Sequence, residues 1–402
     1  MDTTHILSVT AITEVFGEGQ KTIAAAVEYD ADLDAKSVSA EAFEVEDRTI
    51  VDAYVSNCAA RTNTGCGRYV ILELDRFDPD CKTIVTRPKK DGSPGGIANI
   101  VTPRPIVSQN GMIRTQAGVE YPAQAPVAAK AVINLVADDF KVFTYRLADG
   151  RKVDYNLYIP ENLEPGKEYP LVYFIVDAGM LSDDMSVTLA QSPGATVWAS
   201  PEEQAKHPCF VLAPQFHGPE SLVQDDFSCT WEVDAAYELV RHIMDVYPID
   251  KKRVYGTGQS MGCMTTCELA SRDPELYGGC LLVGGQWDPE RMVAAKKNNI
   301  WISVSSGDEK AFPGMNAIAA ALEAAGETVV RANLDATDMP AMNRVVKEMS
   351  QDGYHIHYTC FEGNTVIPVG VEPNGGNHHV NSWRVTYDIE ALRDWLFAQH
   401  KD

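Results

Sequence analysis

Residues 258–262 form the pentapeptide Gly-Gln-Ser-Met-Gly, and this segment restricts the possible folds more than any other part of the sequence. Residues 254–255 favour a short strand before it, and residues 263–269 favour a helix after it. A serine on so sharp a strand-to-helix turn has a strained backbone, and the residues two before and two after it must be small to let the elements pack closely. Both places are glycine. The pattern therefore predicts that Ser260 stands exposed at the end of a sheet strand.

The sequence around this turn alternates between strands and helices. Apolar runs such as 170–176 and 210–213 are typical of parallel strands covered on both faces. Strands are expected at 140–147, 152–159, 170–176, 210–213, 254–257, 279–284, 300–305, 329–334 and 357–361, and helices at 231–247, 315–325, 341–351 and 385–400. This alternation predicts an α/β domain over residues 131–402, with a doubly wound, mostly parallel sheet. Its active site belongs at the carboxyl ends of the strands.

Residues 1–130 have a different pattern. Segments with a period of two, or rich in β-branched residues, recur with turn residues between them, at 6–16, 22–29, 39–45, 49–55 and 67–74. Short strands at this spacing without a credible helix predict a smaller all-β, immunoglobulin-like sandwich. Residues 88–127 are rich in proline and glycine, including the cluster at 91–96, and are expected to form long turns that end in a linker.

In an α/β domain with a serine on this kind of turn, the acid follows a later strand and the histidine follows the last one, so both come after the serine in the chain. Asp308 stands just after the strand expected at 300–305 and is the proposed acid, with Glu309 as the nearest alternative. The base is expected on a loop between the last strand and the closing helix. This loop carries both His378 and His379. We favour His379 as the base and His378 as its neighbour or a substrate contact.

Backbone amides are expected to stabilise the negative charge that develops on a carbonyl oxygen. One is the amide of Met261, at the start of the helix after Ser260. The other is placed at Ala178, in the loop after the strand at 170–176. Four side chains near carboxyl ends of strands are proposed to line the substrate pocket, with packing at its rim as the alternative role: Gln215, Trp231, Gln286 and Trp287.

The chain of 402 residues carries a formal net charge of −23, which disfavours nucleic acid and anionic membranes as partners. The sequence shows neither a signal peptide nor an apolar run long enough to span a membrane, so we expect a cytoplasmic protein, or a secreted one if a signal peptide has been removed. No cofactor is expected. If the chain forms a homo-oligomer, the N-terminal module is the part expected to mediate it.

The cysteines and histidines outside the proposed site suggest no metal. Nine cysteines, none in a Cys-x-x-Cys pair, favour reduced structural thiols, with Cys58, Cys66 and Cys81 as the place where one disulfide could form. His355 and His357 share one face of a strand, but no cluster of acids or cysteines in the sequence completes a site with them.

Beyond these patterns, the sequence resembles two-domain serine esterases with an N-terminal immunoglobulin-like domain, whose catalytic domain is related to polyhydroxybutyrate depolymerases, feruloyl esterases and prolyl-oligopeptidase-type hydrolases. The resemblance covers most of residues 135–400 and extends to the first domain only in layout. The matching segments are 198–204, 208–215, 256–262, 285–288 (Gly-Gln-Trp-Asp), 306–309 (Ser-Gly-Asp-Glu), and His379 with Trp383 ahead of 394–397 (Asp-Trp-Leu-Phe). Many relatives have His-Gly where this chain has Val176-Asp177.

The resemblance implies an α/β-hydrolase fold with Ser260 as nucleophile, Asp308 as acid and His379 as base. It implies hydrolysis of carboxylic esters, with short-acyl, aryl or hydroxycinnamoyl groups. Two other functions stay open. One is a serine peptidase similar to prolyl oligopeptidase, and the other is a binding or assembly protein built on a hydrolase scaffold.

Overall fold

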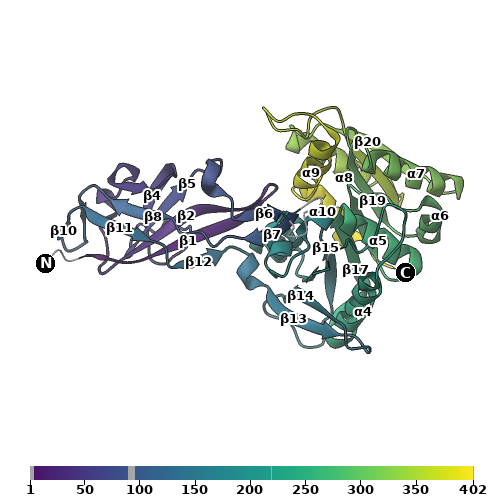
Figure 1. The fold of residues 1–402 in the computed structure, drawn as a ribbon, viewed down its shortest axis with the longest axis horizontal. Coiled ribbons are helices and arrows are strands. Elements are labelled where there is room, and N and C mark those ends of the chain that lie inside the picture. Colours follow the sequence, from purple (N-terminus) through teal and green to yellow (C-terminus); the bar gives the residue numbers. More distant parts are fainter. Residues whose placement is uncertain (1–3, 89–95, 219, 402) are drawn as a thin grey trace. The chain divides into compact units, whose positions relative to one another are not determined.

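The computed structural model describes residues 4–88, 96–218 and 220–401 (Figure 1). Its contacts divide the chain into one unit of Met1–Val85 with Ile100–Asp138, and a second of Thr86–Asn99 with Asp139–Asp402. The division falls later than the boundary expected between residues 130 and 131. The reason is that β12 (Ala131–Asn134) pairs in parallel with β1 (Ile6–Phe16) and so completes a sheet of the first unit.

The first unit contains a five-stranded and a three-stranded sheet whose side chains share one core. Val27 and Leu72 of the larger sheet and Val107 of the smaller one are fully buried in it. The buried Tyr29 hydroxyl donates to Gln109 Oε1 at 2.8 Å and links the two sheets. The strands, in spatial order, are β12, β1, β2 (Gly19–Tyr29), β5 (Tyr69–Leu74) and β4 (Ile50–Ser56), and then β11 (Gln124–Ala128), β8 (Ile106–Gln109) and β3 (Phe43–Val45).

Two expectations for this half need correction. Within 39–45, only β3 is a strand, because residues 40–42 form a 3-10 turn before it. The stretch at 88–127 is more regular than its proline and glycine content suggested; its residues 89–95 lie outside the described residues. The short strands in or beside it, besides β8 and β11, are β6 (Ile84–Pro88), β7 (Gly96–Ile100), β9 (Ile113–Arg114) and β10 (Glu120–Tyr121).

The second unit is built on the expected mixed sheet, which has nine strands. Three strands at one edge are antiparallel neighbours, and from the third strand onward every pairing is parallel. The spatial order is β13 (Lys141–Arg146), β14 (Lys152–Tyr158), β16 (Phe210–Gln215), β15 (Tyr169–Ile175), β17 (Ile249–Gln259), β18 (Gly279–Val283), β19 (Ile300–Ser305), β21 (Ile356–Phe361) and β20 (Val329–Leu334). The buried strands β15 and β19 are apolar along most of their length because helices cover both faces.

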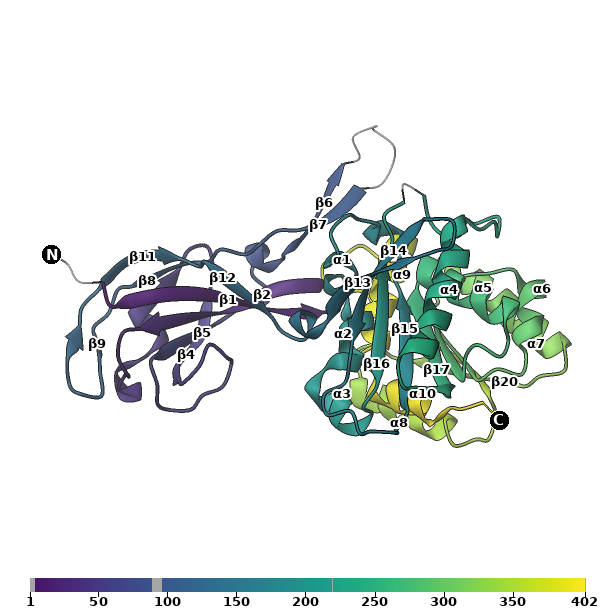
Figure 2. The same ribbon diagram turned by 90° about the horizontal axis from the view of Figure 1, so that it is seen from below.

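Helices lie on both sides of this sheet (Figure 2). One layer contains α4 (Trp231–Val246), α5 (Met261–Arg272), α6 (Pro289–Met292) and α7 (Ala311–Ala324). The other contains α3 (Pro201–Lys206), α8 (Met339–Met349) and α10 (Glu390–Ala398). The remaining helices are α1 (Val187–Ala190), α2 (Pro193–Thr196) and α9 (Gly375–Thr386). No helix in the described part of the chain is long and apolar enough to cross a membrane.

The end of the chain differs from the expected loop and single closing helix. Residues 375–386 form α9, and a short break separates it from α10. Asn374 begins α9 because its side chain accepts a hydrogen bond from the Asn377 amide at 2.9 Å. The sequence Asn-Gly-Gly looks like a turn, but here it is the start of a helix. His378 and His379 therefore lie on a helix and not on a loop.

Candidate active site

Ser260 stands at the turn between β17 and α5, in a conformation rare for a residue with a side chain. Its φ is 53° and its ψ is −119°. The adjacent backbone is tightly packed: a Cβ atom added to Gly262 would lie 1.8 Å from the Ile175 carbonyl oxygen, and one added to Gly258 would lie 2.6 Å from the same atom. The two glycines thus let β15, β17 and α5 approach closely enough to hold the turn.

The structure brings the three proposed catalytic side chains into one hydrogen-bonded line. Nε2 of His379 lies 2.9 Å from Oγ of Ser260, and its Nδ1 lies 2.5 Å from Oδ2 of Asp308. Asp308 is buried after β19, and its other oxygen accepts from the amides of Lys310 and Ala311 at 3.1 and 2.9 Å. Its carboxylate is therefore fixed on both oxygens. The arrangement allows the imidazole to take the proton of the serine hydroxyl.

The two adjacent histidines have separate surroundings. His379 faces Ser260, and its ring forms a T-shaped contact with Trp383 one turn later on α9. His378 is buried on another side of the helix, where its ring nitrogens contact Ser305 Oγ at 2.8 Å and Asn364 Oδ1 at 3.2 Å. Side chains of consecutive helical residues point in different directions. Only His379 thus reaches the serine.

The two residues expected to supply oxyanion amides, Met261 and Ala178, line the same pocket as Ser260. Met261 is the first residue of α5, so its amide has no acceptor within the helix. Ala178 begins a 3-10 turn, Ala178–Met180, beside it. The following amide, of Gly179, already donates to Oδ1 of Asp177 at 2.8 Å. Ala178 is exposed and lines the same pocket as Ser260 and Met261.

Asp177, to which the sequence analysis gave no role, links this turn to the serine. Its Oδ2 accepts from Nε2 of Gln259 at 3.2 Å, and Gln259 directly precedes Ser260. The Gln259 oxygen in turn accepts from the Ser192 hydroxyl at 3.1 Å. Burial raises the pKa of Asp177, and the hydrogen bond from Gln259 acts in the opposite direction. Two features of the sequence could have pointed to Asp177: it follows an apolar strand, and it stands where many relatives have His-Gly.

Ser260 opens into a pocket of about 460 Å³. Its floor includes the apolar side chains of Met261, Met264 and Val223. Its rim is polar, and an ion pair between Lys310 and Asp225 at 2.6 Å crosses it. The side-chain Nε2 of Gln286 donates to Oδ1 of Asp225 at 2.8 Å. The pocket therefore has an apolar interior and a charged edge, which is typical of sites for small organic ligands.

Of the side chains proposed to line the pocket, only Gln286 does so. Gln215 is buried at the end of β16, where it hydrogen-bonds Thr188 and the Met180 carbonyl. Trp287 is buried and donates from its ring nitrogen to Glu268. Trp231 lies at the start of α4 with the Arg151 guanidinium over its ring. Sequence position at a strand end did not reveal which way these side chains point.

Metal ligands do not gather at the pocket. Within the part of the chain that the structure describes, no group of three close histidine, cysteine or carboxylate side chains lies beside Ser260. The pair considered from sequence, His355 and His357, contacts the main-chain carbonyls of Lys296 and Met349. Each ring also lies beside one carboxylate, Glu327 at 3.3 Å from His355 and Asp352 at 3.2 Å from His357. The nine cysteines are all unpaired, including Cys58, Cys66 and Cys81.

Comparisons with known proteins agree with this architecture. Residues 8–122 match the family model described as the esterase Ig-like N-terminal domain. A solved structure described as a thermostable esterase is 28% identical, with a TM-score of 0.83, over 98% of this chain and 100% of that one. No curated protein matches the chain. The predicted resemblance to two-domain esterases and the predicted fold, an immunoglobulin-like domain followed by an α/β-hydrolase domain, are confirmed.

More distant solved structures match a smaller share of the chain. One is an S954A mutant of the feruloyl esterase module from Clostridium thermocellum complexed with sinapinate, which is 13% identical with a TM-score of 0.39. The match covers 63% of this chain and 88% of that one. Another, Thermogutta terrifontis esterase 2 phosphorylated by paraoxon, is also 13% identical, with a TM-score of 0.38, over 64% of this chain and 90% of that one.

Proposed function

We propose that this chain is a serine ester hydrolase that cleaves carboxylic esters through an acyl-enzyme. The observation that carries the proposal is the line of Ser260, His379 and Asp308, joined at 2.9 and 2.5 Å. The whole-chain likeness to a thermostable esterase supports the same chemical class.

The reaction begins when the Ser260 oxygen attacks the ester carbonyl carbon while His379 takes the hydroxyl proton. Asp308 holds the imidazole so that Nε2 faces the serine, and it stabilises the imidazolium that forms. The carbonyl oxygen becomes an oxyanion, to which the amides of Met261 and Ala178 donate. The tetrahedral intermediate then collapses: the bond to the alkoxy oxygen breaks, and the alcohol leaves with the proton from His379.

Water completes the cycle by the same steps. His379 removes a proton from the water as its oxygen attacks the acyl carbon, and the oxyanion forms in the same place. When this second intermediate collapses, the bond to Oγ breaks and the proton returns to Ser260. A carboxylic acid is released, and the reaction as written consumes only the ester and one water molecule.

The pocket favours small esters with an apolar acyl or aryl group. The thioether side chains of Met261 and Met264 adapt to flat or branched groups. The Lys310 and Asp225 pair at the rim is mostly solvent-exposed and lies where a polar substituent would emerge. A hydroxycinnamoyl group has this division, because its apolar ring carries a polar hydroxyl, and short-acyl and aryl groups fit the apolar part of the pocket.

A fluorophosphonate probe tests the serine mechanism directly. We expect it to label wild type at Ser260, with labelling abolished in Ser260→Ala and strongly slowed in His379→Ala. A folded wild-type protein that resists the probe would support the binding-protein alternative.

Turnover of p-nitrophenyl esters, compared with aminoacyl anilides, separates esterase from peptidase, and a preference for anilides would overturn the ester assignment. A panel of esters differing in acyl length and aromaticity then defines the acyl group.

A further inference from the structure

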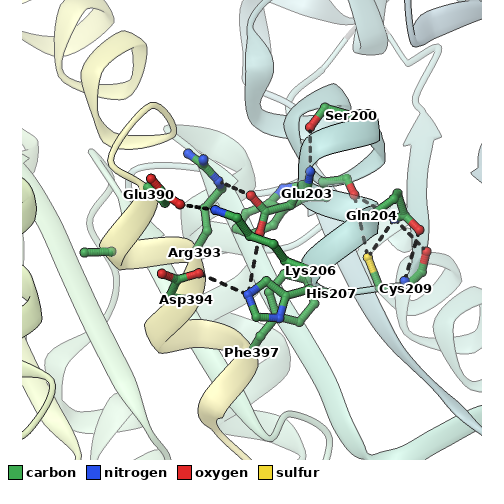
Figure 3. A network of polar contacts seen from close by, with 12 residues as sticks. Ser200, Glu203, Gln204, Lys206, His207, Cys209, Glu390, Arg393, Asp394 and Phe397 are labelled. Carbon is green, nitrogen blue, oxygen red and sulfur yellow. Dashed lines mark hydrogen bonds and ion pairs between the residues drawn. The ribbon is translucent and has the colours of Figure 1, made fainter.

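A second group of polar side chains lies where α3 meets α10, outside the Ser260 pocket (Figure 3). Glu203 is the third residue of α3, His207 directly follows the end of that helix, and Asp394 lies on α10. One ligand atom from each, a carboxylate oxygen or a ring nitrogen, lies within 4.8 Å of the others. We propose that these three side chains bind a divalent transition-metal ion of the zinc class, which joins the C-terminal helix to α3.

Glu203 carries the main observation. Its side chain is only 3% exposed, and its Oε1 atom is buried without any hydrogen-bond partner. The distance from Oε1 to Nε2 of His207 is 3.9 Å, too long for a hydrogen bond. A buried carboxylate oxygen without a partner costs roughly 1–3 kcal/mol or more, so such oxygens are rare in folded proteins. A cation beside Oε1 would satisfy it.

The usual role of a glutamate at this helix position does not account for Glu203. It is the third residue of α3 after the capping residue Ser200, where a glutamate often bonds back to the amide of the capping residue. Here the Ser200 amide donates to the Val197 carbonyl instead. The Glu203 carboxylate turns toward α10, where Arg393 Nε donates to its Oε2 at 2.7 Å. Arg393 thus orients the carboxylate and leaves Oε1 directed at His207 (Figure 3).

His207 is held with its Nε2 toward the two acids. Its ring stacks on Phe397 with a centroid separation of 4.5 Å and an angle of 11° between the planes. Nε2 lies 3.0 Å from Oδ1 of Asp394. The stacking fixes the plane of the imidazole, and the contact with Asp394 directs Nε2 toward the acids.

The neighbouring charges permit a cation. Three carboxylates (Glu203, Glu390 and Asp394) face two basic side chains, Lys206 and Arg393. Lys206 pairs with Glu390, and Arg393 occupies only Oε2 of Glu203. Neither base is hydrogen-bonded to Oε1 of Glu203 or to Oδ1 of Asp394, the two oxygens that would bind the metal. Before any metal binds, the acids outnumber the fixed positive charges by one.

The ligand types and spacing select the class of metal. One imidazole nitrogen and two carboxylate oxygens are typical ligands of Zn²⁺, whereas Ca²⁺ and Mg²⁺ prefer oxygen ligands alone. Ligand atoms at about 2.0–2.2 Å from a tetrahedral Zn²⁺ lie roughly 3.4 Å apart. The distances from Nε2 of His207, 3.0 Å to Asp394 and 3.9 Å to Glu203, bracket this value, and all three ligand atoms lie within 4.8 Å of one another. Water would complete the coordination on the exposed side.

Titration of metal-stripped full-length protein with ZnCl₂ in a calorimeter tests the site. We expect one Zn²⁺ per chain, with affinity that falls as the pH is lowered because protons compete for Nε2. Asp394→Asn should weaken binding at least tenfold, and Zn²⁺ should raise the Tm of wild type but not of this variant. Asp394 is suited to the test because its side chain is 52% exposed, so the variant should fold.

Glu390→Gln is the matched control. Glu390 lies one turn before Asp394 on α10, is 51% exposed, and pairs with Lys206 rather than facing the proposed ion. This variant should bind Zn²⁺ as wild type does. His207→Gln should lose binding, while Ser260 remains reactive toward the fluorophosphonate probe, which separates this site from His379. No stoichiometric binding by wild type, or unchanged binding in both Asp394→Asn and His207→Gln, would refute the site.

Discussion

Ser260 combines a reactive position with a strained backbone. Among the described residues, only a few other than glycine have a positive φ, and Ser260 is one of them. Such a conformation persists because the surrounding packing fixes it. In this conformation the Ser260 Oγ lies 2.9 Å from Nε2 of His379, and the residue lines the pocket.

Asp308→Asn should lower kcat roughly 10³- to 10⁴-fold with little change in stability. The amide would favour the wrong tautomer of His379 and could not stabilise its protonated form. Kinetics with a p-nitrophenyl ester measure the effect. Glu309→Gln serves as the control because Glu309 lies at the pocket without contacting the histidine ring by a hydrogen bond. A larger loss in the control would transfer the acid role to Glu309.

Asp177→Asn should change how stability depends on pH. Burial raises the pKa of Asp177, so between the pKa of the unfolded chain, about 3.9, and the higher value of the fold, the folded state binds more protons. The contribution of Asp177 to wild-type stability therefore falls as the pH rises through this window. Asparagine has no such proton, so the variant should gain stability relative to wild type over the same range. Urea unfolding at several pH values measures the difference, and a constant difference would contradict it.

At the scale of elements, the turn from β17 to α5 depends on close contact with β15. Gly262→Ala should cost about 3 kcal/mol or more, since its Cβ would overlap the Ile175 carbonyl. The matched control is Gly376→Ala on α9, where the new Cβ would meet only Asn374 Oδ1 at 3.5 Å. In a helix this change should stabilise by roughly 0.5–1 kcal/mol. Chemical unfolding compares the two, and equal effects would contradict the role of packing.

Helix α9 shows where element prediction from sequence fails. Its first residues, Asn-Gly-Gly-Asn, have poor helix propensity, so the local pattern favours a loop. Tertiary contacts stabilise the helix instead, through the buried side chains of His378 and Trp383. The sequence located the histidine pair correctly after the last strand, but the helix decides which of the two faces Ser260.

At the scale of the whole molecule, two separately packed units follow each other along the chain, except that one segment of the first half groups with the second unit. Residues 86–99, although they interrupt the first unit in sequence, belong by their contacts to the second. There the Ala98 carbonyl accepts a hydrogen bond from the Ser182 hydroxyl at 2.8 Å, and both residues are buried. A fragment that begins at residue 139 would therefore lack part of its own unit. Self-association through the first unit stays a prediction.

The thiols provide a test that spans both units. Ellman's reagent should react rapidly with two of the nine cysteines, the exposed Cys58 and Cys66, and with Cys229 more slowly. The buried thiols should react only after denaturation, because the reagent cannot reach them in the folded protein. Burial also raises the pKa of the Cys360 thiol to about 11, which lowers its reactivity further. Reducing agent should leave the Tm unchanged. Fewer than nine reactive thiols in the denatured, unreduced protein would reveal a disulfide.

The sequence alone determined the order of the two domains, the turn at Ser260, the candidate acid Asp308 and the histidine pair 378–379, because these features depend on local periodicity, on small residues at fixed spacing and on chain order. Only the tertiary structure decided which histidine reaches the serine, which predicted wall residues are buried, and that Glu203, His207 and Asp394 meet. The reason is physical: side-chain direction and contacts between residues far apart in sequence are fixed by packing, which local patterns do not encode.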